Sequence, residues 1–285
     1  MTRPPRPFPT PFSAVLLTLM GAFFTAAIAV MAADWATPTA AIGIGTVVGL
    51  GGAGLLGATN VLPPHAERVG LRLPKARHLL PLLLLVPVAL LASEADNLVH
   101  ALWPAPDAQQ VVQETVERLP TDTRLALLET AIVAVGLVPV VEEWFFRGVL
   151  QQGLVASLGA TGGLLLTALL FALGHGAGMS PQAWAALVAQ TLVFGVAFGF
   201  ARHKTGSLVS AILLHAAVNG LGVAAMAAPT LVAIAGYNAP GTHTPWAVLA
   251  AAAASVALGA WLLAREEPPA IPAVRVVDEG DPYED

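Results

Sequence analysis

Long apolar segments dominate this sequence and restrict the folds that it can adopt. An α-helix needs about 20 apolar residues to cross the hydrocarbon core of a bilayer. Eight segments are candidates: 12–33, 39–62, 79–93, 125–151, 158–177, 184–201, 207–227 and 246–264. Charged residues make up only 11% of the chain, against about 25% in soluble domains. The sequence therefore predicts an all-α, polytopic membrane bundle of about eight transmembrane helices.

The first three of these segments have features that set them apart from the others. The first resembles a signal peptide, but its apolar run from Phe12 to Ala33 exceeds the about 7–15 residues of a signal-peptide core. We therefore expect a retained transmembrane helix. The second is rich in glycine, which lets neighbouring helices approach closely. The third reaches full length only if it extends through the sequence EADNLVHALW.

Loop charges predict the orientation. The N-terminus and the segments 63–78 and 202–206 are basic, whereas 94–124 is mainly acidic. Basic loops remain in the cytoplasm, so we expect both termini there. Residues 107–119 have the pattern of an amphipathic interfacial helix. The Pro-rich, acidic residues 265–285 have the composition of a disordered cytoplasmic tail.

Composition also limits partners and compartment. The chain has no cysteine, which excludes disulfides and thiolate metal sites. It has no basic stripe or groove-reading motif, so we expect no nucleic-acid partner. The alanine-, glycine- and proline-rich composition, without a recognisable eukaryotic sorting signal, favours a bacterial inner or cell membrane. The sequence leaves the oligomeric state open.

The stretch VEEWFFRG, residues 141–148, places three charges inside an apolar segment. Charged residues within membrane helices are costly and mark functional sites by default. Glu143 and Arg147 are four residues apart, so they share a helix face and can pair. Glu142 lies about 100° further round the helix. We therefore expect Glu142 to face a cavity.

Two later segments carry polar residues that can complete such a site. His175 lies in FALGHGAG, and His215 and Asn219 lie one helical turn apart in HAAVN. A carboxylate, two imidazoles and an amide can hold a water, take its proton and donate hydrogen bonds to an oxyanion. Taken singly, each has a structural alternative: a buried histidine can be satisfied by packing, and an asparagine can bond a neighbouring helix.

These stretches resemble a known family. EEWFFRG resembles the EExxxR motif of the CPBP (Abi) family, which includes type II CAAX prenyl endopeptidases. FALGH resembles that family's FxxxH motif, and HAAVN resembles its HxxxN/D motif. The three occur in the family's order on successive apolar segments, within about residues 125–220. The resemblance implies an intramembrane endopeptidase with a four-helix catalytic core in the second half of the chain.

The resemblance also implies a role for each residue. Glu142 would be the general base, His175 would position the water, His215 and Asn219 would stabilise the oxyanion, and Glu143 and Arg147 would support the site. The implied partners are the lipid bilayer and a membrane-anchored protein or peptide substrate. Whether that substrate is prenylated, a bacteriocin-like peptide or a sorting signal stays open.

Two questions remain open at this point. Glu142, His175 and His215 could instead hold zinc with an open position, but the sequence lacks HExxH, which favours a metal-free mechanism without a required cofactor. The same residues could serve a transporter or proton relay, although no inverted repeat is evident. A non-catalytic scaffold is the third possibility.

We divide the chain into four parts: an N-terminal transmembrane region (1–124) of three helices and the outer amphipathic segment, a catalytic core (125–227), a last transmembrane helix (228–264) and the tail (265–285). One difficulty concerns depth. At about 1.5 Å per residue, Glu142 lies about 14 Å and His175 about 22 Å from the cytoplasmic edge. The pattern alone does not explain how they meet.

Overall fold

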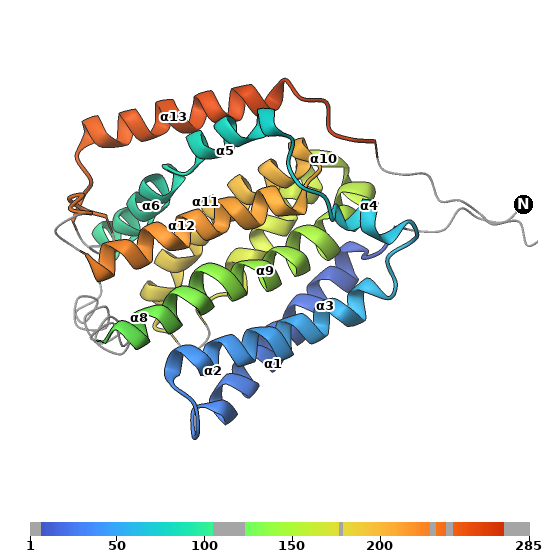
Figure 1. Ribbon diagram of the computed structural model, residues 1–285, viewed down its shortest axis with the longest axis horizontal. Helices are drawn as coiled ribbons and strands as arrows, with labels where there is room; N and C mark the ends of the chain where they lie inside the picture. The colour runs from blue at the N-terminus through green and yellow to red at the C-terminus, as the bar shows by residue number, and fades with distance from the viewer. Residues whose placement is uncertain (1–6, 105–122, 177–178, 229–231, 238–241, 271–285) are drawn as a thin grey trace, which may run out of the picture.

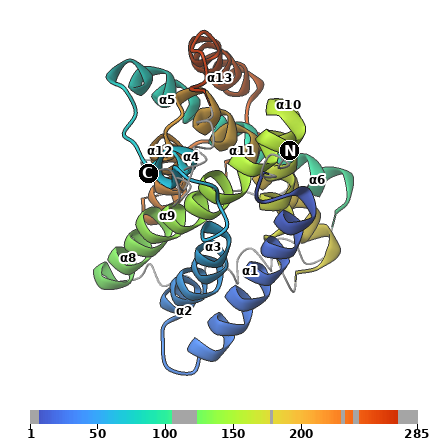
Figure 2. The ribbon, with the colours of Figure 1, turned by 90° about the vertical axis from the view of Figure 1, so that its right-hand side faces the viewer.

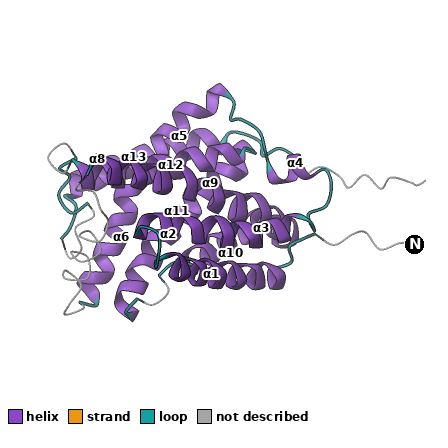
Figure 3. Cartoon of the chain, turned by 60° about the horizontal axis from the view of Figure 1, so that its bottom comes forward, coloured by secondary structure: helices purple, strands orange, loops and turns teal. Residues whose placement is uncertain are grey.

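The computed structural model describes residues 7–104, 123–176, 179–228, 232–237 and 242–270. Within these ranges every regular element is a helix and none is a strand (Figure 3). The α-helices are α1 (Pro11–Ala32), α2 (Pro38–Gly45), α3 (Gly51–Ala58), α4 (His65–Val69), α5 (Leu79–Leu85), α6 (Val88–Leu102), α8 (Arg124–Thr130), α9 (Val138–Glu143), α10 (Gln151–Leu173), α11 (Pro181–Thr205), α12 (Leu208–Ala227) and α13 (Trp246–Ala264). Short helices of other types lie between some of them. These are the π-helices η1 (Thr46–Leu50), η3 (Ala131–Leu137) and η4 (Trp144–Leu150), and the 3-10 helix η2 (Ala76–His78).

The helices have the length and apolarity of membrane spans. Seven continuous helical stretches among the described residues qualify. One of them, Arg124–Leu173, has 50 residues and bends at Gly159, whose φ is +75°. A Cβ on Gly163 would lie 2.4 Å from the Val155 nitrogen, so the chain folds back at this bend. The stretch thus supplies two of the predicted segments, and the predicted polytopic helical bundle is confirmed.

This hairpin explains how Glu142 and His175 reach the same depth. Arg147 donates to the Gly195 carbonyl at 3.2 Å, and a Cβ on Gly195 would lie 2.9 Å from the Cα of Ala168. Arg147 and Ala168 are therefore level on the two arms. Glu142 lies about 8 Å of helix before Arg147, and His175 about 11 Å after Ala168. The two residues are level within about one turn.

The predicted helix ends were wrong at this point. The helix expected over 125–151 continues past Gln151 to the bend at Gly159. Counted from the bend at Gly159, Glu142 is 17 residues away (159 − 142) and His175 is 16 residues away (175 − 159), so counting the two from different helix ends produced the apparent difference in depth. The third segment also differs from its shortest expected form, since its helical stretch runs over Ala76–Leu102.

The glycines of the second segment allow the close packing expected of them. In Figure 2, α1 lies beside α2 and α3. A Cβ on Gly45 would lie 2.5 Å from the Thr25 carbonyl oxygen, and one on Gly49 would lie 2.3 Å from the Thr25 nitrogen. A side chain at either position would collide with the α1 backbone. Glycine at these sites therefore sets the distance between the first two spans.

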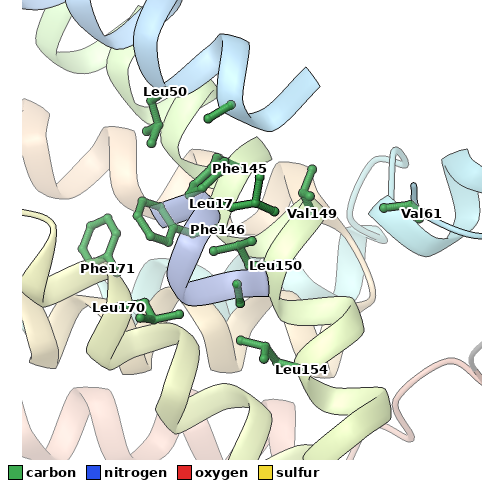
Figure 4. Packing of buried hydrophobic residues seen from close by; sticks show 12 residues of the cluster. Leu17, Leu50, Val61, Phe145, Phe146, Val149, Leu150, Leu154, Leu170 and Phe171 are labelled. Carbon is green, nitrogen blue, oxygen red and sulfur yellow. The ribbon is translucent and has the colours of Figure 1, made fainter. Parts of the chain in front are cut away.

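The N-terminal helices pack directly onto the second half of the chain. In Figure 1, α9, α11 and α12 lie in the middle of the bundle, with α1–α3 on one side and α5 and α13 on the other. Leu17 and Leu50 join a buried cluster with Phe145, Phe146 and Phe171 (Figure 4). This packing fixes the helix that follows Glu142 and Glu143.

Some sequence predictions lie outside the described residues. These are the interfacial helix at 107–119, the basic residues Arg3 and Arg6, and the tail from 271 onward. The four-part division of the chain also stays a prediction.

Candidate active site

Three separate elements bring Glu142, His175 and His215 together. Glu142 lies in α9, His175 follows the end of α10, and His215 lies in α12. The Glu142 carboxylate lies 3.9 Å from Nε2 of His175 and 4.0 Å from Nε2 of His215. These distances are longer than a direct hydrogen bond. A small polar molecule such as water could therefore bridge Glu142 to each of the two histidines.

Glu143 has a second partner that sequence reasoning missed. Its Oε1 accepts from Nη1 of Arg147 at 2.8 Å, which is the predicted pair. The same oxygen bonds Nδ1 of His215, also at 2.8 Å. Glu143 and Arg147 are both fully buried. Glu143 therefore links Arg147 to His215 and fixes the ring that faces Glu142.

Both histidine rings are oriented by their Nδ1 atoms. Nδ1 of His215 faces the Glu143 carboxylate, and Nδ1 of His175 faces the Phe171 carbonyl oxygen at 2.6 Å. Because a carboxylate and a carbonyl only accept, each Nδ1 carries the proton. Each Nε2 is then directed toward Glu142, as an acceptor in the neutral ring and a donor in the imidazolium.

Asn219 lies one turn beyond His215, and its amide bonds the backbone of η3. Its Nδ2 donates to the Ala134 carbonyl at 2.8 Å. That carbonyl lacks its usual partners, because the Val138 N–H bonds Val133 instead and Pro139 has no N–H. An unsatisfied carbonyl in a membrane is costly. The structure therefore places the Asn219 amide against this carbonyl.

Aromatic rings enclose the buried polar groups. The Phe198 ring stacks on the His215 ring at 4.7 Å, and the Phe171 ring meets the His175 ring edge to face at 4.6 Å. The Arg147 guanidinium lies 4.3 Å from the centre of the Phe171 ring. Motif spacing signals Phe171 within FxxxH, whereas nothing in the sequence pattern marks Phe198. These rings hold the two imidazoles and keep bulk water from Arg147.

A cavity adjoins Asn219 between α6, η3, α11 and α12. It has a volume of about 240 Å³. Apolar side chains form most of its wall, including Phe194 and Met226, and Gln190 and Asn219 add amides. Gln190 is the polar residue near the middle of the predicted 184–201 segment. The cavity can take an apolar side chain or lipid chain next to the polar site.

The fit to a metal ion can be judged from the donor atoms. Across the described ranges, no group of three or more His, Cys, Asp or Glu side chains has the arrangement of a metal site. The Glu142 carboxylate lies 3.9 and 4.0 Å from the Nε2 atoms of His175 and His215. Two zinc ligands that each lie about 2.0–2.2 Å from the metal are separated by less than about twice that distance, so these three side chains are the residues that would hold a zinc ion.

Comparison with known proteins identifies the part of the chain that carries this site. Residues 124–221 match the family model Rce1-like, described as type II CAAX prenyl endopeptidase Rce1-like. No curated protein and no solved structure gave a match to the chain. The match contains Glu142, Glu143, Arg147, His175, His215 and Asn219. Residues 124–221 are therefore similar to the Rce1-like type II CAAX prenyl endopeptidases, and the chain is an integral membrane protein that carries an Rce1-like protease domain.

Proposed function

We propose that the chain is a glutamate-dependent intramembrane endopeptidase that hydrolyses a peptide bond near a membrane-anchored segment of its substrate. The observation that carries this proposal is the convergence of Glu142, His175 and His215 from three elements, with the Glu142 carboxylate 3.9 and 4.0 Å from the two Nε2 atoms. A carboxylate and two oriented imidazoles form a suitable holder for a reacting water.

The first chemical step is attack by water. Glu142 accepts a proton from the water while the water oxygen bonds the carbonyl carbon. His175 positions the water through its Nε2, whose orientation is set by the bond from Nδ1 to the Phe171 carbonyl oxygen. The C–N bond then breaks, and the proton held by Glu142 passes to the amine. Atoms and protons balance without a covalent enzyme intermediate.

The developing oxyanion needs hydrogen-bond donors. His215 serves as one donor through Nε2 of its imidazolium form, while its Nδ1 is held by the Glu143 carboxylate at 2.8 Å. Asn219 serves as the second. Its amide carries two N–H groups, and one of them is used by the Ala134 carbonyl. The other N–H of the Asn219 amide donates to the oxyanion. Glu143 and Arg147 support the site by holding His215.

The substrate is a membrane-anchored protein or peptide. The cavity of about 240 Å³ beside Asn219 supports this assignment, because its mainly apolar wall suits an apolar side chain or lipid chain. We also propose that the protein resides in a bacterial cell membrane with both termini in the cytoplasm, as the basic segments 63–78 and 202–206 favour. The mechanism requires no cofactor.

The test uses purified protein in proteoliposomes with a library of membrane-anchored peptides, read by mass spectrometry. We expect cleavage by the unaltered chain, before and after treatment with a zinc chelator, and none by Glu142→Ala. Cleavage by Glu142→Ala would overturn the role of Glu142, and loss after chelation that zinc restores would support the metal alternative. Ion-driven uptake that requires Glu142, without cleavage, would identify a transporter.

A further inference from the structure

A second polar cavity lies at the end of the bundle formed by α4 and the last turn of α11. Its volume is about 80 Å³. Its wall contains the arginines Arg68, Arg72, Arg147 and Arg202, together with a single carboxylate, Glu67. The excess of guanidinium groups makes this cavity attractive to an anion.

Two of these arginines have unused donors. Nε of Arg147 and Nε of Arg202 are buried and lack a hydrogen-bond partner. The rest of the Arg202 group is fixed, since its Nη2 donates to the carbonyls of Arg68 and Val69 at 2.9 and 3.0 Å. A buried donor without a partner is costly. Both side chains are at least nine-tenths buried, and both belong to the cavity wall, so a bound anion would offset their buried positive charge.

The C-terminal segment limits what can enter. Pro268–Ala270 form part of the cavity wall, and a Cβ on Gly206 would lie 2.2 Å from the Pro269 ring. Glu266 holds this segment in place through Arg77, at 2.6 Å. A cavity of about 80 Å³ has room for one tetrahedral anion. The occupant is therefore a small anionic group, either free or at the tip of a larger molecule.

We propose that this cavity binds one phosphate group. Guanidinium groups match phosphate oxygens with paired hydrogen bonds, and a basic pocket between membrane helices at the cytoplasmic face is a recurring lipid-headgroup site. The cavity lies among the basic segments 63–78 and 202–206, where an anionic lipid and a free phosphate ion can both reach it. This cavity does not include Glu142, His175 or His215, and Arg147 connects the two regions because it lines the cavity and also pairs with Glu143.

The test measures thermal unfolding of the full chain in phosphate-free maltoside micelles. In one arm, inorganic phosphate replaces chloride at constant ionic strength. In the other, phosphatidylglycerol is compared with diacylglycerol, which has the same acyl chains and lacks phosphate. The variant is Arg72→Gln, since Arg72 is the exposed arginine of the wall. The matched control is Lys75→Gln, which removes one charge from the same exposed loop outside the cavity.

We expect phosphate, phosphatidylglycerol or both to raise the melting temperature of the unaltered chain and of Lys75→Gln. For Arg72→Gln the midpoint concentration should rise about tenfold, the loss expected for one charge-assisted hydrogen bond. A response to phosphatidylglycerol alone identifies a lipid headgroup, and a response to phosphate alone identifies a free ion. No response in either arm, or equal responses in the two variants, would overturn the proposal. A retained melting temperature in chloride shows that Arg72→Gln is folded.

Discussion

The first two spans and the Rce1-like domain are both apolar helical regions, but different contacts hold their helices together. Between α1 and the second span, glycines bring backbones into contact, and a Cβ on Gly49 would meet the Thr25 nitrogen at 2.3 Å. In the Rce1-like domain, Glu143 and Arg147 are fully buried as an ion pair. Lipid chains are as apolar as the helices, so close packing drives the first kind of contact. Burying charged side chains within a membrane protein costs free energy, and a helix bundle that served only as a scaffold could avoid that cost.

This difference separates two kinds of information in the sequence. Apolar length shows that a segment crosses the membrane and says little about its purpose. A buried charge shows where side chains have to be held in one arrangement. Here Arg147 holds Glu143, and Glu143 holds His215. The following variants test whether the two regions respond as differently as their contacts suggest.

The largest effect on stability should come from Arg147→Met. This change leaves the buried Glu143 carboxylate without its cation, and breaking a buried pair costs about 3–5 kcal/mol. Replacing both partners, in Glu143→Leu with Arg147→Met, should restore most of the stability. It should not restore turnover, because His215 then has no Nδ1 partner. Denaturant unfolding in micelles and a cleavage assay would measure the two quantities. Equal stability of the single and double variants would contradict this account of the pair.

A smaller effect is expected from Gly49→Ala in the N-terminal region. The added Cβ meets the α1 backbone at 2.3 Å, and overpacking of this kind costs about 1–3 kcal/mol. Gly52→Ala is the matched control, since a Cβ there has nothing within 4 Å. Unfolding measurements should separate the two variants, while the folded fraction of each cleaves substrate normally. If Gly52→Ala were as unstable as Gly49→Ala, helix contact at Gly49 would not be the cause.

The smallest effect on stability should come from Asn219→Ala. It removes the donor to the Ala134 carbonyl, and such bonds between membrane helices contribute about 1 kcal/mol. Adding Pro139→Ala restores a backbone N–H at position 139 and should recover that loss. Turnover should stay low in both variants, since the oxyanion donor is still absent. Recovery of turnover by Pro139→Ala would show that Asn219 acts only through the backbone.

The apolar pattern predicted the fold class well because membrane spans follow from length and composition. It could not place the bend of the Arg124–Leu173 stretch, since Gly159 is one glycine among several in that region. The helix end expected at residue 151 was wrong for that reason. The depth difference between Glu142 and His175 follows from the same error.

The candidate site was less fully predictable. Helical spacing separates Glu142 from the Glu143–Arg147 pair, and the structure has that geometry. The bond from His215 to Glu143 joins positions on different helices, so no local pattern signals it. The bond from Asn219 to the Ala134 carbonyl also joins two helices, so no local pattern signals it. That carbonyl is free to accept because Pro139 has no N–H. Local spacing predicts which residues share a face, and tertiary packing decides which faces meet.

The most direct test of the central claim compares Glu142→Gln with Glu129→Gln in proteoliposomes. Both changes remove one carboxylate from the Arg124–Leu173 stretch, but Glu129 hydrogen-bonds Thr37, away from the histidines. The measured quantities are the cleavage rate and the affinity for uncleaved substrate. We predict that Glu142→Gln binds substrate normally and cleaves it about 10³-fold more slowly, the loss expected for a general base. Glu129→Gln should cleave at the rate of the unaltered chain. A cleavage rate for Glu142→Gln equal to that of Glu129→Gln would contradict the account.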